Sequence, residues 1–174
     1  MRLHEENTLG EVASALGKGL LAGLAGTVAI TVSQMIEMKI TGRKPSEAPV
    51  KVAAQVTGAA PANDSEKEKV SNEIHFAYGT SWGAVRGLIG LAGLKGLPAT
   101  AVHFAAIWAA ELIMLPKYDA APPVNEQEPK SVAIDAFHHA VYAVASGLVY
   151  DALDAGGRHE RKVQSIMRKL KQLK

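Results

Sequence analysis

The chain has no cysteine among its 174 residues. Disulfide bonds, thiolate metal ligands and a cysteine nucleophile are therefore excluded together. Aromatic residues are also scarce, at 5% of the sequence, whereas glycine occurs 16 times and alanine dominates the apolar stretches. Because large side chains are too few to fill a wide core, the composition predicts helices whose backbones approach one another closely.

The sequence also lacks the short signatures that accompany common kinds of catalysis. It contains no G-x-S-x-G nucleophile elbow, zinc-protease helix, P-loop or G-x-G-x-x-G fingerprint. Its glycines recur instead at spacings typical of helix faces. We therefore expect that the protein is not an enzyme. The formal net charge of +2 is too small to indicate nucleic acid as a partner.

One long run without formal charge lies near the N-terminus. Residues 19–36, GLLAGLAGTVAITVSQMI, stand between Lys18 and Glu37. Such a run just reaches the length needed to cross a hydrocarbon core of about 30 Å. A secretory signal peptide is the alternative, but the acidic start HEEN and the lack of a clear cleavage signature favour a membrane span.

Three further apolar segments each contain a single formal charge, which is Arg86, Glu111 or Asp135. Together with the first run they predict an all-α fold, an integral membrane four-helix bundle. Most prolines fall between the segments, where helix breaks are expected. The predicted spans are residues 17–38, 74–94, 98–115 and 132–153, within one membrane domain of residues 1–157.

A soluble helical interaction module, rich in alanine and glycine, is the competing interpretation, because the mean hydropathy is only +0.05. Glycine inside a water-soluble helix, however, costs up to about 1 kcal/mol relative to alanine. In lipid, Gly19 and Gly23 form a GxxxG pair of the kind that lets helices pack closely. We therefore favour the membrane interpretation.

Two segments repeat one unusual spacing. HFAYGTSWGAVR (residues 75–86) and HAVYAVASGLVY (residues 139–150) both place His first, Tyr three later, Gly eight later and a large polar residue eleven later. Offsets of three and eleven return close to the starting face of a helix. The preceding loops, GRKPSEAPV and PKYDAAPPV, are also alike. The spacing predicts two tandem helical hairpins related by a pseudo-two-fold repeat.

Glycines on these faces are the predicted points of close helix contact. Gly19 and Gly23 belong to the first span, while Gly83 and Gly147 lie beside the two His-Tyr stripes. Small residues at such positions let a neighbouring backbone approach. We expect a homo-oligomer that packs through these faces, or an accessory subunit of a larger membrane complex.

The C-terminal segment, residues 158–174, carries seven basic residues and only Glu160 as an acid. Its apolar residues recur at helical spacing, so it is predicted as a basic amphipathic helix that lies on an anionic bilayer surface. Packing on the bundle or on a second subunit is the alternative, and the lack of interleaved aromatics disfavours nucleic acid. The predicted membrane-surface residues are Arg158, Arg161, Lys162, Arg168, Lys169 and Lys171.

The distribution of basic residues predicts how the spans are oriented. With four spans both termini share one side, and that side holds ten Lys or Arg residues against eight on the other. Since cytoplasmic segments carry the excess of Lys and Arg, we expect cytoplasmic termini.

Ionisable and hydroxyl side chains inside the spans are the candidate functional residues, because such groups at membrane depth usually face a bundle interior or water. We expect Arg86 to pair with Glu111, and Asp135 to orient His138 or His139 from the preceding helical turn. The set predicted to line a polar interior or pathway is His75, Tyr78, Arg86, His103, Glu111, Asp135, His139, Tyr142 and Tyr150.

Three roles for these residues remain open at this point. They can join helices by hydrogen bonds alone, or they can line a pathway for protons or a small solute. The third role is in a redox or accessory subunit, with haem b bound by His103 and His138, or a metal bound by Asp135, His138 and Glu111. We expect no cofactor and no metal, and this third role is the alternative to that expectation.

The order of these features resembles that of the YagU-like small bacterial inner-membrane proteins, a family of uncharacterised function. The shared features are the apolar first helix, the proline-containing loop with Arg, the His-Tyr-Gly span, the Pro-Pro loop after the third span and the basic C-terminus. The resemblance covers about residues 15–165, although the loop after the first span is richer in charge here. It implies a multi-pass protein of the bacterial inner membrane and implies almost nothing about chemistry.

Overall fold

The computed structural model describes residues 2–58 and 61–172, with side chains described for residues 8–58 and 61–156. The described residues form helices and no strand, which confirms the predicted all-α class. The elements are α1 (Arg2–Thr41), α2 (Ala48–Thr57), α3 (Asp64–Leu91), α4 (Gly96–Lys117), the short 3-10 helix η1 (Val124–Glu126) and α5 (Pro129–Gln172).

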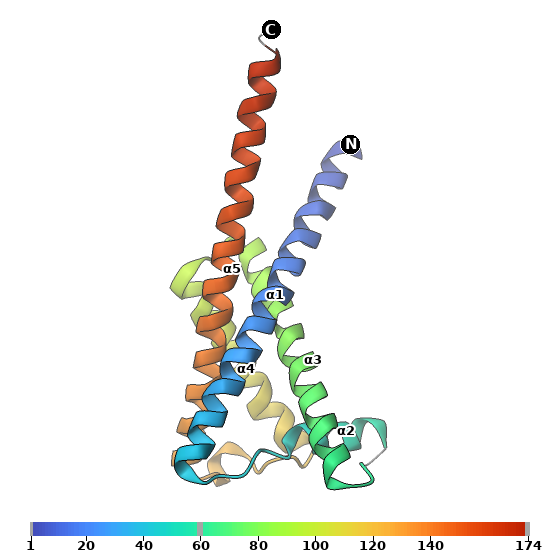
Figure 1. Ribbon diagram of the computed structural model, residues 1–174, viewed down its shortest axis with the longest axis vertical. Coiled ribbons are helices and arrows are strands. Elements are labelled where there is room, and N and C mark those ends of the chain that lie inside the picture. Colours follow the sequence, from blue (N-terminus) through green and yellow to red (C-terminus); the bar gives the residue numbers. More distant parts are fainter. Residues whose placement is uncertain (1, 59–60, 173–174) are drawn as a thin grey trace.

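The four long helices run alternately up and down (Figure 1). α1 descends from the N-terminus, α3 returns, α4 descends again and α5 returns to the end where α1 began. The short helix α2 and η1 lie at the opposite end, with the long connections. Both termini are therefore at one end of the bundle, and we call the other end the loop end.

Local sequence determines where the helices at the loop end start and stop. α3 begins after Asn63, whose side chain accepts a hydrogen bond from the Glu66 backbone N–H at 2.9 Å and thereby satisfies one free donor of the first turn. α2 has Pro49 in its first turn. It ends at Thr57 and is capped by Gly58, whose φ of +70° lies in the left-handed region. Lys67 of α3 bonds to Glu47, just before α2, and this hydrogen bond holds the pKa of the Glu47 carboxyl below its usual value.

Three of the helices are long and apolar enough to cross a membrane. They are Thr8–Thr41 in α1, Gly96–Lys117 in α4 and Pro129–Gly156 in α5. The predicted span at residues 74–94, by contrast, is the second part of α3, which is not among these three because Arg86 and several polar residues lower its hydropathy. Within the described part of the chain, three candidate spans are thus found where the sequence predicted four.

α1 and α3 pack with their backbones in close contact at glycines. A Cβ atom on Gly83 would overlap the carbonyl oxygen of Gly19, and one on Gly23 would overlap the backbone of Thr80 and Gly83. Gly147 of α5 faces the Thr100 side chain of α4 instead. All four glycines that were predicted as packing points therefore contact a neighbouring helix of the same chain.

The basic tail is a continuation of α5 and not a separate helix. The backbone stays helical through Gly156 and Gly157 and reaches Gln172 without a break. The predicted surface residues Arg158, Arg161, Lys162, Arg168, Lys169 and Lys171 have side chains that lie outside the described residues.

Polar side chains share the interior with apolar residues such as Ile30 and Ile107, while many large apolar side chains point outward. Exposed residues include Leu21 of α1 (59%), Ile113 of α4 (71%) and Leu148 of α5 (69%). A bundle in water normally buries such residues, so this distribution fits a bundle whose outer surface faces lipid. The largest fully buried side chains are Arg86, His103, His138, Thr27 and Ser146.

Candidate functional site

A file of polar side chains runs along the side of α5 that packs on the other helices; Tyr142, Ser146 and Tyr150 are buried, and the acidic residues toward its two ends are partly exposed. Almost every turn of α5 provides one of these side chains, from the loop end of the helix to the end of its predicted span. At about 1.5 Å per residue, the file extends roughly 28 Å, close to the thickness of a hydrocarbon core. Its members on α5 are Asp135, His139, Tyr142, Ser146, Tyr150, Asp151 and Asp154.

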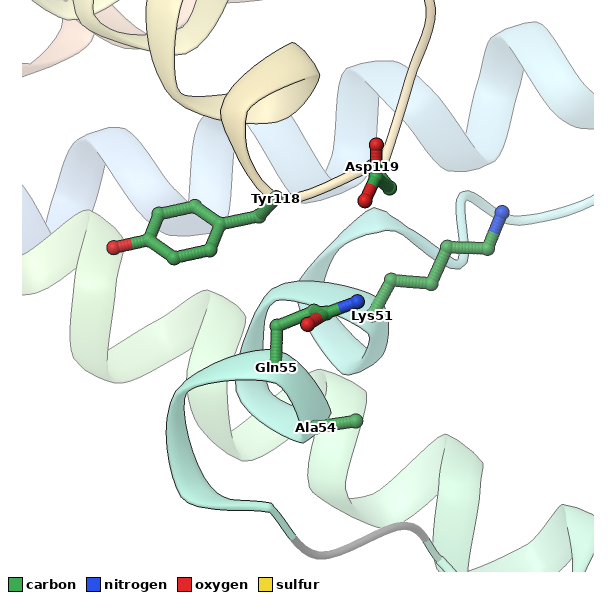
Figure 2. A pocket seen from close by; sticks show the side chains of 5 residues that line it. All are labelled: Lys51, Ala54, Gln55, Tyr118 and Asp119. Atoms are coloured by element: carbon green, nitrogen blue, oxygen red, sulfur yellow. The ribbon is translucent and has the colours of Figure 1, made fainter.

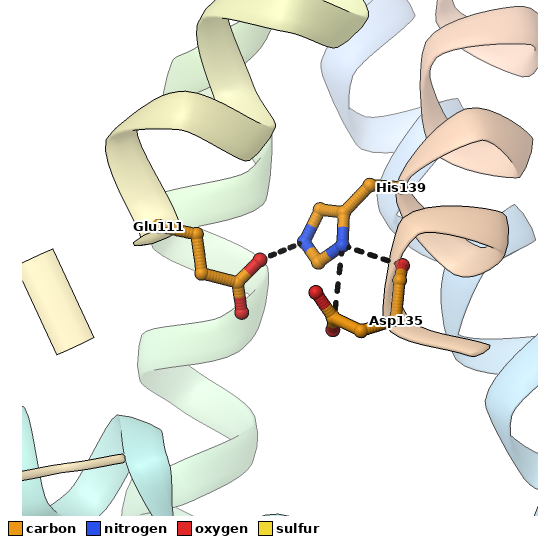
Figure 3. A group of neighbouring side chains, drawn as sticks. All are labelled: Glu111, Asp135 and His139. Carbon is orange, nitrogen blue, oxygen red and sulfur yellow. Dashed lines mark hydrogen bonds and ion pairs between the residues drawn. The ribbon is translucent and has the colours of Figure 1, made fainter. Parts of the chain in front are cut away.

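The loop end of the file is a cluster of two carboxylates and one imidazole (Figure 3). Nε2 of His139 lies 2.8 Å from Oε2 of Glu111, which comes from α4. Nδ1 of the same ring lies 3.5 Å from Oδ1 of Asp135, one helical turn earlier on α5. Trp108 of α4 donates its indole N–H to Oδ2 of Asp135 at 3.2 Å. We call Glu111, Asp135 and His139 the carboxylate–histidine cluster.

The predicted pair of Arg86 and Glu111 is wrong. Arg86 instead bonds to Asp151 of α5, with Nη2 2.6 Å from Oδ1. The reason is depth, because α3 and α4 form an antiparallel hairpin. Arg86 lies five residues before the end of α3 at Leu91, whereas Glu111 lies fifteen residues after the start of α4 at Gly96.

The Arg86 guanidinium is fully buried and lies over the ring of Tyr150, with 4.4 Å between its central carbon and the ring centroid. Its Nε and Nη1 atoms have no hydrogen-bond partner among the described residues. Asp151 also accepts a hydrogen bond from the Gly96 backbone N–H at 3.1 Å. This one carboxylate therefore joins the end of α3 and the start of α4 to α5.

Two tyrosines of the predicted set lie inside the bundle and one does not. The Tyr142 hydroxyl donates to the Gly79 carbonyl at 2.5 Å, and that of Tyr150 to the Gly87 carbonyl at 3.5 Å. Tyr78 is 40% exposed, and its hydroxyl lies 4.0 Å from the sulfur of Met114. The two His-Tyr stripes are thus not equivalent in their surroundings.

The other interior histidines each have a different partner. His75 of α3 lies 3.1 Å from the Thr31 hydroxyl of α1. Nε2 of His103 lies 3.0 Å from the carbonyl oxygen of Trp82 on α3.

His138 of α5 faces α1. Its Nδ1 lies 2.8 Å from the Ser33 hydroxyl, and its Nε2 lies 3.8 Å from Glu37. His103 and His138, the alternative haem ligands, therefore face different helices. The imidazole that faces Glu111 and Asp135 is that of His139, so the expectation that His138 joins these carboxylates at a metal is wrong.

Sequence reasoning missed several residues of the interior. Ser146 and Thr27 are fully buried, and Lys18 pairs with Asp154 at 3.3 Å near the end of the file. Ser146 is four residues from both Tyr142 and Tyr150. Residues four apart lie on the same face of a helix, so this spacing could have predicted its position.

A separate cavity of about 390 Å³ lies at the loop end, away from the cluster (Figure 2). It lies between α2 and the residues that directly follow α4. Asp119 there has φ of +50°, an uncommon conformation for a residue other than glycine. The cavity is lined by Lys51, Ala54, Gln55, Tyr118 and Asp119, so it carries one cation and one carboxylate.

Comparison with known proteins does not identify a relative. No family model, curated protein or solved structure matches the chain. The resemblance to the YagU-like family therefore gains no support from these comparisons.

Proposed function

We propose that this is a small multi-pass protein of the bacterial inner membrane whose interior is a pathway for protons or small cations. Its bilayer-crossing domain consists of α1, α4, α5 and the second part of α3, with both termini in the cytoplasm. The observation that carries the proposal is the polar file of α5, which extends over roughly 28 Å between helices whose outer faces are apolar. Polar groups at membrane depth mark ion pathways and proton relays.

Buried polar groups without partners support conduction over a purely structural role. His103 Nδ1 and two nitrogens of Arg86 make no hydrogen bond among the described residues. Buried polar atoms are nearly always satisfied, by protein or by ordered water. Polar atoms that the protein leaves unused are open to hydration, which a proton pathway needs and helix packing does not.

Formal charges along the file favour cations over anions. Near the end of the file, Arg86 is balanced by Asp151 and Lys18 by Asp154. At the loop end, the cluster has two carboxylates and only one imidazole. A net negative site attracts protons and cations and repels anions.

A structural role is the second candidate, and a specific observation favours it. The hydroxyls of Tyr142 and Tyr150 both donate to backbone carbonyls of α3. Hydrogen bonds of this kind join helices in membranes, each contributing about 0.6 to 2 kcal/mol. Under this alternative the interior residues hold the bundle together and conduct nothing.

Proton flux into vesicles that contain the purified protein separates the two candidates. Vesicles loaded with a pH-sensitive dye are energised with a potassium gradient and valinomycin, and the change in internal pH is followed. Tyr142→Phe removes an interior hydroxyl and should reduce the flux several-fold. Tyr78→Phe removes a half-exposed hydroxyl and should leave it unchanged. Wild-type flux equal to that of empty vesicles would leave only the structural role.

A further inference from the structure

We infer that Glu111, Asp135 and His139 form a binding site for one divalent transition-metal ion. Each residue offers one ligand atom, and the three atoms all lie within 4.8 Å of one another. The ligands come from two helices, with Glu111 on α4 and the other two residues one turn apart on α5. Figure 3 shows the two carboxylates directed toward the imidazole from different sides.

The distances within the cluster are close to those that a metal requires. Bonds of about 2.0 to 2.2 Å from zinc to nitrogen or oxygen put the ligand atoms of a tetrahedral site roughly 3 to 3.5 Å apart. In the structure, Nε2 of His139 is already 2.8 Å from Oε2 of Glu111. The Asp135 carboxylate is closer to the other ring nitrogen, with Oδ1 3.5 Å from Nδ1, so its side chain has to turn toward Nε2 for one ion to contact all three residues.

Hydrogen bonds from the surroundings orient the two α5 ligands. Nδ1 of His139 lies 2.9 Å from the backbone carbonyl oxygen of Asp135. A carbonyl only accepts, so Nδ1 carries a hydrogen, while Nε2 shares a proton with Glu111 across 2.8 Å and gives that proton up when it binds a metal. Trp108 donates to the outer oxygen of Asp135. Hydrogen bonds of this kind orient metal ligands in known sites.

The chemistry of the ligands indicates the class of ion. Mg²⁺ and Ca²⁺ prefer sites built wholly from oxygen, whereas an imidazole favours Zn²⁺, Co²⁺ and similar transition metals. Three protein ligands leave at least one coordination position for water. The site also lies near the loop end and is not sealed by protein, since Glu111 is six residues before the end of α4 and the Asp135 side chain is 38% exposed.

The test is titration of the detergent-purified full-length chain with Zn²⁺ by calorimetry, and with Mg²⁺ in parallel. We expect one Zn²⁺ per chain and no heat from Mg²⁺ at the same concentrations. Glu111→Gln and His139→Gln should each weaken Zn²⁺ binding about tenfold or more. His138→Gln is the matched control, because the neighbouring ring faces Ser33 and Glu37 on α1, and it should bind as the wild type does.

A second measurement does not require a variant of any ligand. The chain has two tryptophans, Trp82 and Trp108, and bound Co²⁺ quenches nearby indole fluorescence. Trp82→Phe leaves Trp108 as the fluorophore beside the site and keeps its hydrogen bond to Asp135. We expect stoichiometric Co²⁺ to quench this protein strongly and the same concentration of Mg²⁺ to leave its fluorescence unchanged.

Three outcomes would overturn the assignment. They are no Zn²⁺ binding by the wild type, a loss of affinity in His138→Gln equal to that in His139→Gln, and Trp108 fluorescence in Trp82→Phe that Co²⁺ leaves unchanged. None of these measurements depends on flux, so the metal site and the proposed pathway can fail independently.

Discussion

Arg86 of α3 donates to Asp151 of α5 across 2.6 Å inside the bundle, with its guanidinium over the ring of Tyr150. Because Arg86 is fully buried, its charge depends on this carboxylate for compensation. The same carboxylate accepts the Gly96 backbone N–H at the start of α4. One ion pair therefore fixes the relative positions of three helices.

Asp151→Asn should destabilise the bundle strongly, because it leaves the Arg86 charge buried without a counter-ion. Removing one partner of a buried pair costs about 3 to 5 kcal/mol, and we expect the lower part of that range because Asp151 is partly exposed. Thermal unfolding in detergent, followed by circular dichroism, measures the effect. Asp154→Asn is the control and should cost less than about 1 kcal/mol, since both members of the Lys18 pair are partly exposed.

The double variant Arg86→Met, Asp151→Asn tests the cause of that loss. It removes the buried charge together with its partner, so it should recover much of the stability that Asp151→Asn loses. A double variant as unstable as the single one would show that the loss comes from something other than the uncompensated guanidinium. Unfolding under the same detergent conditions makes the comparison.

Gly83→Ala should destabilise the contact between α1 and α3, because the new methyl group would overlap the backbone of Gly19 and Gly23. Overpacking of this kind costs about 1 to 3 kcal/mol. Gly17→Ala is the matched control, since nothing lies within 4 Å of the position its Cβ would take. The control should be neutral or slightly stabilising, as alanine is the better helix former. Equal melting temperatures for the two variants would contradict the close contact.

Zn²⁺ should slow flux through the proposed pathway when it is added on the side of the membrane that the loop end faces. The reason is that the inferred metal site occupies the first polar residues of the file. Dye-loaded vesicles measured with and without Zn²⁺ give the size of the effect, and Glu111→Gln should reduce sensitivity to Zn²⁺ several-fold. Inhibition that persists unchanged in Glu111→Gln would place the ion elsewhere.

Local features of the sequence predicted what depends on spacing within one helix. Asp135 and His139 are four residues apart, so their contact follows from helix geometry, and the structure shows it. The glycines of α1 and α3 likewise indicated close packing before any partner was known. The all-α class follows from the long apolar segments and the prolines between them.

Contacts between helices were less predictable, because they depend on where the turns fall and how each helix is rotated. The short turn between α3 and α4 places Arg86 and Glu111 at different depths, so the expected pair does not form. Tyr78 and Tyr142 occupy equivalent positions in the repeated spacing, yet only Tyr142 faces the interior. Equivalent positions in the sequence repeat therefore did not predict equivalent surroundings in the structure.

Ser146→Ala provides the most direct test of the proposed pathway. The Ser146 hydroxyl is fully buried and lies beside the hydroxyl of Tyr142, so its removal should lower stability by no more than about 1 kcal/mol. If the file conducts, proton flux into energised vesicles should fall several-fold while the melting temperature changes little. Ser81→Ala, at an exposed serine that bonds its own helix backbone, should retain full flux. Wild-type flux in Ser146→Ala would contradict conduction along the file.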